Sequence, residues 1–323
     1  MTSAQSTPSL SPAQVEALLD KDVAELLAKF PFPPIDASNL QFTRDTRYAQ
    51  PAVGLSDAVT RRTIKIPGPN GAPNVALRIH RRANVETTLP CLVWIHGGGL
   101  VMGNAEQDDL RFDRWCQSHA MMAISIEYRM APEHQYPAAI DDCYAALSWI
   151  TANATAVGAM PDRIGIGGAS AGAGLAAALA LMARDRGGPA ITSQLLFYPM
   201  LDDRMTTLSS QWEVPIWPPS SNEFGWAAYL GDARGTSDVS PYGAPARATD
   251  VSGLPPTIIV VGALDGFLDE DLTYAQRMLQ AGVPVELHVY PGAPHGFDGL
   301  LPASNVAKRC MTDIHRWITA HYA

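Results

Sequence analysis

The segment Arg163-Ile164-Gly165-Ile166-Gly167-Gly168-Ala169-Ser170-Ala171-Gly172 decides the fold of this chain. Its first half predicts a buried strand, and the apolar run at 175–183 predicts a helix. A strand, a corner of small residues and a helix form the setting in which G-x-S-x-G holds a serine in a strained, exposed conformation. Side chains two positions before and after that serine would collide with backbone unless they were glycine. The segment therefore predicts a nucleophilic serine, Ser170, at a helix N-terminus, with the N–H of Ala171 free beside it.

Short apolar runs alternate with helical patterns on both sides of this segment. The runs at 92–95, 121–126, 163–167, 194–198, 257–261 and 285–290 predict strands, and the patterns at 12–30, 108–119, 137–155, 175–186 and 269–281 predict helices. Residues 63–66 and 75–80 alternate around a Pro-Gly turn, which predicts an antiparallel hairpin. Ser11 is the expected N-cap of the first helix. We expect an α/β fold with a mostly parallel central sheet, an antiparallel start and helices on both faces.

Two regions do not follow this alternation. Residues 1–50 precede the sheet, and residues 201–253 interrupt it. The interruption carries the aromatic residues Trp212, Trp217, Phe224 and Trp226 among prolines and polar residues. Aromatic side chains in an irregular insertion need an apolar surface to contact, and a lid over a pocket would provide one. A surface excursion packed on its own aromatic residues is the alternative.

A glycine triplet follows directly on the predicted strand at 92–95. In His96-Gly97-Gly98-Gly99 the missing Cβ atoms would let the N–H groups of Gly97 and Gly98 approach a substrate oxygen. Taken alone, the triplet fits a flexible loop or a phosphate site equally well. Beside G-x-S-x-G, it favours an oxyanion hole formed by Gly97, Gly98 and Ala171.

An acid and a histidine each follow one of the last two predicted strands. Asp265 comes directly after the strand at 257–261 and its short Gly-Ala-Leu tail, and His295 lies in a glycine-containing loop after the strand at 285–290. Asp269 is the rival acid, but it reads as a first-turn carboxylate of the next helix. The order Ser170, Asp265, His295 is the order in which an α/β-hydrolase carries its catalytic triad.

These residues together resemble a known family, the hormone-sensitive-lipase-like (bacterial family IV) carboxylesterases of the α/β-hydrolase superfamily. The motifs that carry the resemblance are His96 to Gly99, Tyr128 to Glu133 with Pro137 and Asp141, Gly168 to Gly172, Tyr198-Pro199, Gly253 to Pro256, Asp265 to Glu270, and His295 to Phe297. The resemblance implies an α/β-hydrolase core at 51–200 and 254–323, N-terminal cap helices at 1–50 and a cap insertion at 201–253. It also implies a homodimer.

The same resemblance implies two-step acyl transfer on short-chain carboxylic esters. Ser170 would be the nucleophile, His295 the general base and then acid, and Asp265 the carboxylate that orients it. Amides, lactones or carbamates are alternative substrates, and a catalytically weak small-molecule receptor of the same fold is the alternative function. Three departures, Ala169 before the serine, Gly266-Phe267 after the acid and Leu100 after the glycines, concern the pocket. Its expected lining is Leu100, Trp212, Trp217, Phe224 and Trp226.

Composition limits the remaining function classes. The chain has 323 residues, of which 47% are hydrophobic and 17% charged, with a formal net charge of -9, so we expect no nucleic-acid partner. Four separated cysteines predict buried free thiols. Neither H-E-x-x-H nor paired C-x-x-C motifs occur, and the implied reaction needs no metal or organic cofactor. The polar start without a signal-peptide pattern, and apolar runs shorter than the roughly 20 residues of a membrane helix, predict a soluble cytoplasmic protein with no membrane partner.

Overall fold

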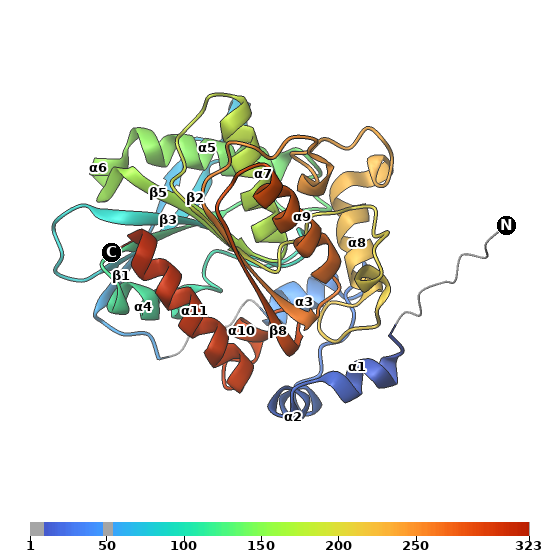
Figure 1. Cartoon of the computed structure of the whole chain (residues 1–323). Helices are drawn as coiled ribbons and strands as arrows, with labels where there is room; N and C mark the ends of the chain where they lie inside the picture. The colour runs from blue at the N-terminus through green and yellow to red at the C-terminus, as the bar shows by residue number, and fades with distance from the viewer. Residues whose placement is uncertain (1–9, 48–53, 323) are drawn as a thin grey trace.

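A mixed sheet of eight strands runs through the described part of the protein, residues 10–47 and 54–322 of the computed structural model (Figure 1). The strands are β1 (Val59–Ile66), β2 (Val75–Arg82), β3 (Leu89–Ile95), β4 (Met122–Glu127), β5 (Ala159–Ala169), β6 (Gln194–Phe197), β7 (Thr257–Leu264) and β8 (Val285–Pro294). Their order is β1-β2-β4-β3-β5-β6-β7-β8, and only the β1–β2 and β2–β4 pairs are antiparallel. This confirms the predicted fold class, including the hairpin at its start.

Helices cover both faces of the sheet, and central strands such as β3 are therefore buried on both sides. Cys91, Val93 and Ile95 of β3 belong to one apolar cluster, whereas Leu92 and Trp94 belong to another. The first cluster takes in α5 (Ala138–Ala152), α6 (Ala154–Val157), α7 (Ala171–Asp185) and α9 (Leu268–Gln280). The second takes in α4 (Asp109–Ser118), α10 (Phe297–Leu300) and α11 (Asn305–Tyr322).

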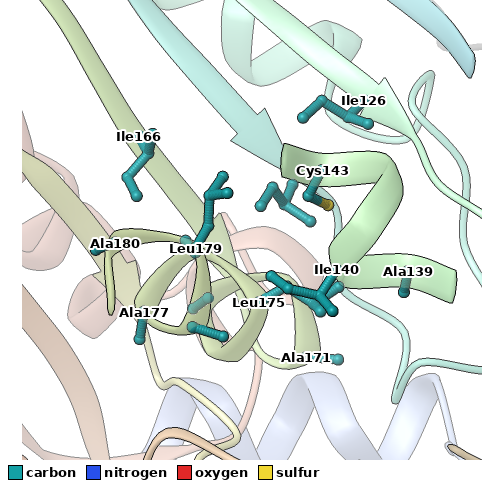
Figure 2. Packing of buried hydrophobic residues seen from close by; sticks show 14 of the residues in the cluster. Ile126, Ala139, Ile140, Cys143, Ile166, Ala171, Leu175, Ala177, Leu179 and Ala180 are labelled. Carbon is teal, nitrogen blue, oxygen red and sulfur yellow. The ribbon is translucent and has the colours of Figure 1, made fainter. Parts of the chain in front are cut away.

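Helix α7 lies close to its neighbours because its sequence is rich in alanine and glycine. Figure 2 shows Leu175 of α7 near Ile140 of α5, with Leu179 between α7 and the strand that carries Ile166. Small residues along α7 let the helix approach both the sheet and α5. The start of α7 is thereby held firmly at the end of β5.

The structure has two N-terminal helices where the sequence pattern predicts one. The structure has α1 (Pro12–Leu18) and α2 (Lys21–Lys29), and the chain is extended at Leu19 between them. Asp20 accepts a hydrogen bond from the N–H of Asp22 and caps α2. This local side-chain bond favours a new helix start over continuation of α1. The predicted cap of α1 is confirmed, because Ser11 and Gln14 form a capping box.

The N-terminal helices and the 201–253 insertion pack against each other and against the carboxyl ends of the strands. The N–H of Ile35 donates to Ser221 Oγ at the start of α8 (Pro219–Leu230), at 2.8 Å. The N–H of Asp20 donates to the carbonyl of Gly292 in β8, at 3.0 Å. Arg44 of α3 (Leu40–Arg47) donates to the carbonyls of Val101 and Ala131.

Several expectations about the ends of these regions fall on undescribed residues. Positions 1–9 and 48–50 of the expected N-terminal cap segment lie outside the described residues. The division into core and cap stays a prediction. The four cysteines are buried and unpaired, as predicted. None of the helices in the described part of the chain combines the length and apolar composition that a bilayer span requires.

Candidate active site

The corner between β5 and α7 holds Ser170 in a strained backbone conformation. Its φ of 57° and ψ of -123° lie in a region that side chains rarely adopt. The Ser170 N–H donates to the carbonyl of Phe197 at 2.8 Å, and its carbonyl accepts from the N–H of Met200 at 3.1 Å. A Cβ on Gly172 would stand 2.0 Å from the carbonyl oxygen of Ile95, so this residue must be glycine for α7 to begin here. The corner is therefore fixed by both neighbouring strands.

Ser170, His295 and Asp265 lie in one hydrogen-bonded line. His295 Nε2 is 2.9 Å from Ser170 Oγ, and His295 Nδ1 is 2.8 Å from Asp265 Oδ2. All three side chains are buried, and Asp265 Oδ1 accepts a further bond from the N–H of Phe267 at 3.0 Å. Because each residue follows the carboxyl end of a parallel strand, the sheet brings together residues separated by up to 125 positions.

Aromatic side chains surround the imidazole of His295. The rings of Tyr198 and Phe267 meet it edge-on, with centroids at 4.7 and 5.0 Å. The ring of Trp217 is tilted relative to the imidazole, with the two ring centroids 6.4 Å apart. These contacts restrict rotation of the imidazole and keep both nitrogens on their partners.

The glycine loop lies beside Ser170. A Cβ on Gly97 would stand 3.3 Å from Ser170 Cβ, which shows how closely the loop approaches the serine. The carbonyl of Gly98 accepts bonds from the N–H groups of Val101 and Met102. Among the described residues, no hydrogen bond uses the N–H of Gly97 or Gly98. The N–H of Ala171, the first residue of α7, has no helical acceptor either. Three N–H groups on the segments beside Ser170 are therefore left without a backbone acceptor in the described part of the chain.

A cavity of about 710 Å³ opens above Ser170 and His295. Its walls come from the glycine loop, α4, the insertion and the segment from His295 into α11. Of the five expected pocket residues, Trp217 lies in this wall, and its ring occupies the space that a Cβ on Gly99 would need. Leu100, Trp212, Phe224 and Trp226 are not among the residues that line it.

Packing explains where three of these four side chains lie. Leu100 and Trp226 are buried in the apolar cluster that includes α5 and α7, and Phe224 packs against that cluster. Trp212 is half-buried. The helical face of α8 that carries Trp226 turns toward the core, which a sequence read as an irregular insertion could not indicate.

One wall of the cavity carries charged side chains that the sequence pattern does not indicate. Arg111 of α4 forms ion pairs with Asp108 at 3.0 Å and Asp298 at 2.9 Å, and Asp298 also accepts a hydrogen bond from the Tyr198 hydroxyl. Burial opposes the charge of Arg111, but the carboxylates of Asp298 and Asp108 outweigh it and raise the pKa of the guanidinium. Asp298 stands three residues after His295, which is the only sequence signal that could have drawn attention to it.

Two further carboxyl groups are buried near Asp265, in the first turn of α9. Glu270 Oε1 accepts bonds from the N–H groups of Leu201 and Asp202, at 2.7 and 3.2 Å. Neither carboxylate oxygen of Asp271 has a hydrogen-bond partner among the residues that the structure describes. Burial raises the pKa of both carboxyls well above their ordinary values, and nearby carboxylates including Asp265 raise them further. Within residues 10–47 and 54–322, no group of three or more His, Cys, Asp or Glu side chains could hold a metal ion.

Comparison with known proteins identifies the family. Residues 92–299, more than half of the chain, match the family described by its alpha/beta hydrolase fold. The esterase LipI of Mycobacterium tuberculosis is 35% identical over 76% of this chain and 78% of its own. The carboxylesterase NlhH of the same species is 36% identical over 71% of this chain and 73% of its own.

Solved structures agree with this assignment. A bacterial heroin esterase superposes with a TM-score of 0.90 at 39% identity, over 95% of this chain and 99% of its own. The esterase LipW of Mycobacterium marinum gives a TM-score of 0.83 at 33% identity, over 97% and 98%. The chain therefore belongs to the α/β-hydrolase superfamily, as a serine carboxylesterase of the hormone-sensitive-lipase-like family IV.

Proposed function

We propose that the protein hydrolyses short-chain carboxylic esters through Ser170, His295 and Asp265. The observation that carries the proposal is the 2.9 Å contact between Ser170 Oγ and His295 Nε2, with Asp265 on the opposite nitrogen. His295 takes the hydroxyl proton as Ser170 Oγ attacks the ester carbonyl, and then gives it to the leaving alcohol. Water activated by the same imidazole releases the acid from the acyl-enzyme.

The N–H groups of Gly97, Gly98 and Ala171 are the proposed oxyanion hole. They lie on the two segments next to Ser170 Oγ, and the N-terminus of α7 adds its partial positive charge. Such donors act on charge that develops only in the tetrahedral intermediate, so they lower the barrier more than they tighten substrate binding. Removing one donor of this kind typically costs about 10²–10³ in kcat.

The walls on two sides of the cavity support a preference for short esters. Trp217 and Ile216 close the cavity on the side of the insertion, and the paired charges of Arg111, Asp108 and Asp298 occupy another wall. The 201–253 insertion and the N-terminal helices are the proposed cap over it, because they pack together at the carboxyl ends of the strands. The expected homodimer and the exclusion of nucleic acid stay predictions.

Hydrolysis of p-nitrophenyl acetate tests the proposed function. Purified wild-type protein should turn the ester over, and Ser170→Ala should lose at least about 10³ of kcat/KM, because a triad without its nucleophile retains only binding and the oxyanion donors. Circular dichroism and thermal unfolding of the variant should match the wild type. A Ser170→Ala protein that keeps its turnover would refute the assignment, and binding without turnover in the wild type would favour the receptor alternative.

A further inference from the structure

Ile216 lines two hollows of the molecule. One is the cavity above Ser170 and His295, and the other is a groove of about 480 Å³ beside α1 and α2. Its side chain is almost fully buried, and its Cγ2 lies 3.9 Å from the place of a Cβ on Gly296, next to His295. Among the described residues that line the two hollows, only Ile216 is common to both.

The backbone at Ile216 is strained. Its φ is 75°, which is a genuine outlier for a β-branched residue. The N–H of Trp217 donates to the carbonyl of Pro215 at 2.9 Å, so Ile216 is the centre of a three-residue turn of the rare, strained kind. A residue that prefers extended backbone persists here because packing on both sides holds it, and such strain is concentrated at sites that contact ligands.

The groove beyond Ile216 is apolar. It lies between α1, α2 and residues 213–218, and its lining includes Val15, Leu19, Leu27 and Phe32. Glu16 and Glu213 are its charged lining residues, and both are exposed. This lining suits an alkyl or aryl group and disfavours an anionic one. The walls of the groove and of the catalytic cavity meet at Ile216.

We propose that Ile216 sets the length limit of the substrate, and that the α1–α2 groove is an extension of the substrate site for the apolar end of a longer ester. The inference rests on the proposed ester hydrolysis at Ser170. With isoleucine in place, the chain of the ester ends against its side chain. A smaller residue at 216 opens the groove to the methylenes beyond.

Chain-length selectivity tests this inference. The substrates are p-nitrophenyl esters from acetate to decanoate, which lengthen the acyl side, and alkyl acetates from methyl to octyl, which lengthen the alcohol side. For each protein, kcat/KM is divided by its own value for the shortest ester, so the ratio does not depend on how much protein is folded. Ile216→Ala should raise the ratio for octanoyl or octyl esters at least about tenfold, since each buried methylene contributes about a factor of three to four. The series that responds shows which end of the ester enters the groove.

Matched variants separate the groove from mere widening of the cavity. Ala28 lines the groove on α2 and is exposed, so Ala28→Trp fills the groove without touching the cavity. The double variant Ile216→Ala/Ala28→Trp should lose the gain. Leu110→Ala widens the cavity beside α4, and any gain it gives should not respond to Ala28→Trp. Ile216→Val keeps the β-branched shape and should give a smaller gain, which Ala28→Trp again removes; it also serves if the alanine variant fails to fold.

Two results would overturn the inference. One is an unchanged ratio in both series for Ile216→Ala and Ile216→Val, and the other is a gain that survives Ala28→Trp undiminished. Either result is compatible with hydrolysis of acetate esters by the wild type. Failure of the proposed function would instead appear as a wild-type protein that hydrolyses no ester in either series.

Discussion

Tyr198 serves two parts of the site with one side chain. Its ring meets the imidazole of His295 edge-on, and its hydroxyl donates to Asp298, the partner of Arg111. Burial and the negative charge of Asp298 raise the pKa of Tyr198 well above its ordinary value, so the hydroxyl stays protonated and remains a donor. The catalytic histidine is thus tied through packing to the charged wall of the cavity.

Tyr198→Phe should destabilise the protein by about 1.5–3 kcal/mol, because a buried hydrogen bond to a carboxylate is lost while the ring contact stays. Urea unfolding measures the loss. Tyr274→Phe is the matched control. The buried Tyr274 hydroxyl has no hydrogen-bond partner within residues 10–47 and 54–322, so its removal should be neutral or stabilising. Equal losses in the two variants would contradict the network.

The sequence indicates site residues that directly follow strand ends. It does not indicate residues whose role depends on tertiary packing. Ser170, Asp265 and His295 could be selected because strand, loop and chain order all point to them. Arg111 and Asp298 could not, because the contact between α4 and the start of α10 exists only after both pack on the same face of the sheet. Trp217 and Trp226 carry identical side chains in one insertion, yet one lines the cavity and the other is in the core.

At the scale of elements, the strand–corner–helix unit determines the geometry of the site. Gly168 and Gly172 stand where the start of α7 lies close to neighbouring backbone, and the motif alone predicts their positions. A Cβ on Gly168 would lie 2.4 Å from the backbone of Gly172. The start of α7 and the Ser170 corner are therefore one rigid piece, which holds the N–H of Ala171 in place.

Gly172→Ala should abolish activity and cost more than about 3 kcal/mol of stability, because the added Cβ meets backbone, which cannot move aside as a side chain can. Gly187→Ala is the comparison: Gly187 has a φ of 57° but open space around it, so its cost should stay near 1 kcal/mol. Thermal unfolding and esterase assays of both variants measure the difference. A soluble, active Gly172→Ala enzyme would show that α7 can shift.

At the scale of the whole molecule, the alternation of apolar runs and helical patterns was sufficient to predict the sheet and its two covered faces. It could not predict the break between α1 and α2, because a single side-chain cap at Asp20 decides it. It also could not show that α4, α10 and α11 form a wall of the cavity. Walls are built by tertiary contacts between distant segments, and one sequence carries little signal for them.

Buried acids near Asp265 make the stability of the whole fold depend on pH. Folding raises the pKa of Glu270, so the folded state binds more protons than the unfolded state above the ordinary carboxyl pKa of about 4.3. The free energy of unfolding therefore falls as pH rises from there toward the raised pKa of the folded state.

Glu270→Gln should remove the share of this dependence that Glu270 contributes, because the amide oxygen can still accept the N–H groups of Leu201 and Asp202 but cannot ionise. The share of Asp271 stays. Relative to the wild type, the variant should gain stability as pH rises above the ordinary carboxyl pKa of about 4.3, as measured by urea unfolding. Glu25→Gln, on the exposed face of α2, provides the background and should show no such growth. A difference that is constant or shrinks with pH would contradict burial as the cause.

The identity of the residue that a serine-directed reagent modifies covalently is the most direct test of the whole account. Diethyl p-nitrophenyl phosphate transfers its phosphoryl group to the activated serine of such a site, releasing p-nitrophenolate, and peptide mass spectrometry locates the adduct. We predict one adduct per chain, on Ser170, formed in step with the loss of esterase activity. Complete loss of activity with Ser170 unmodified would contradict the account.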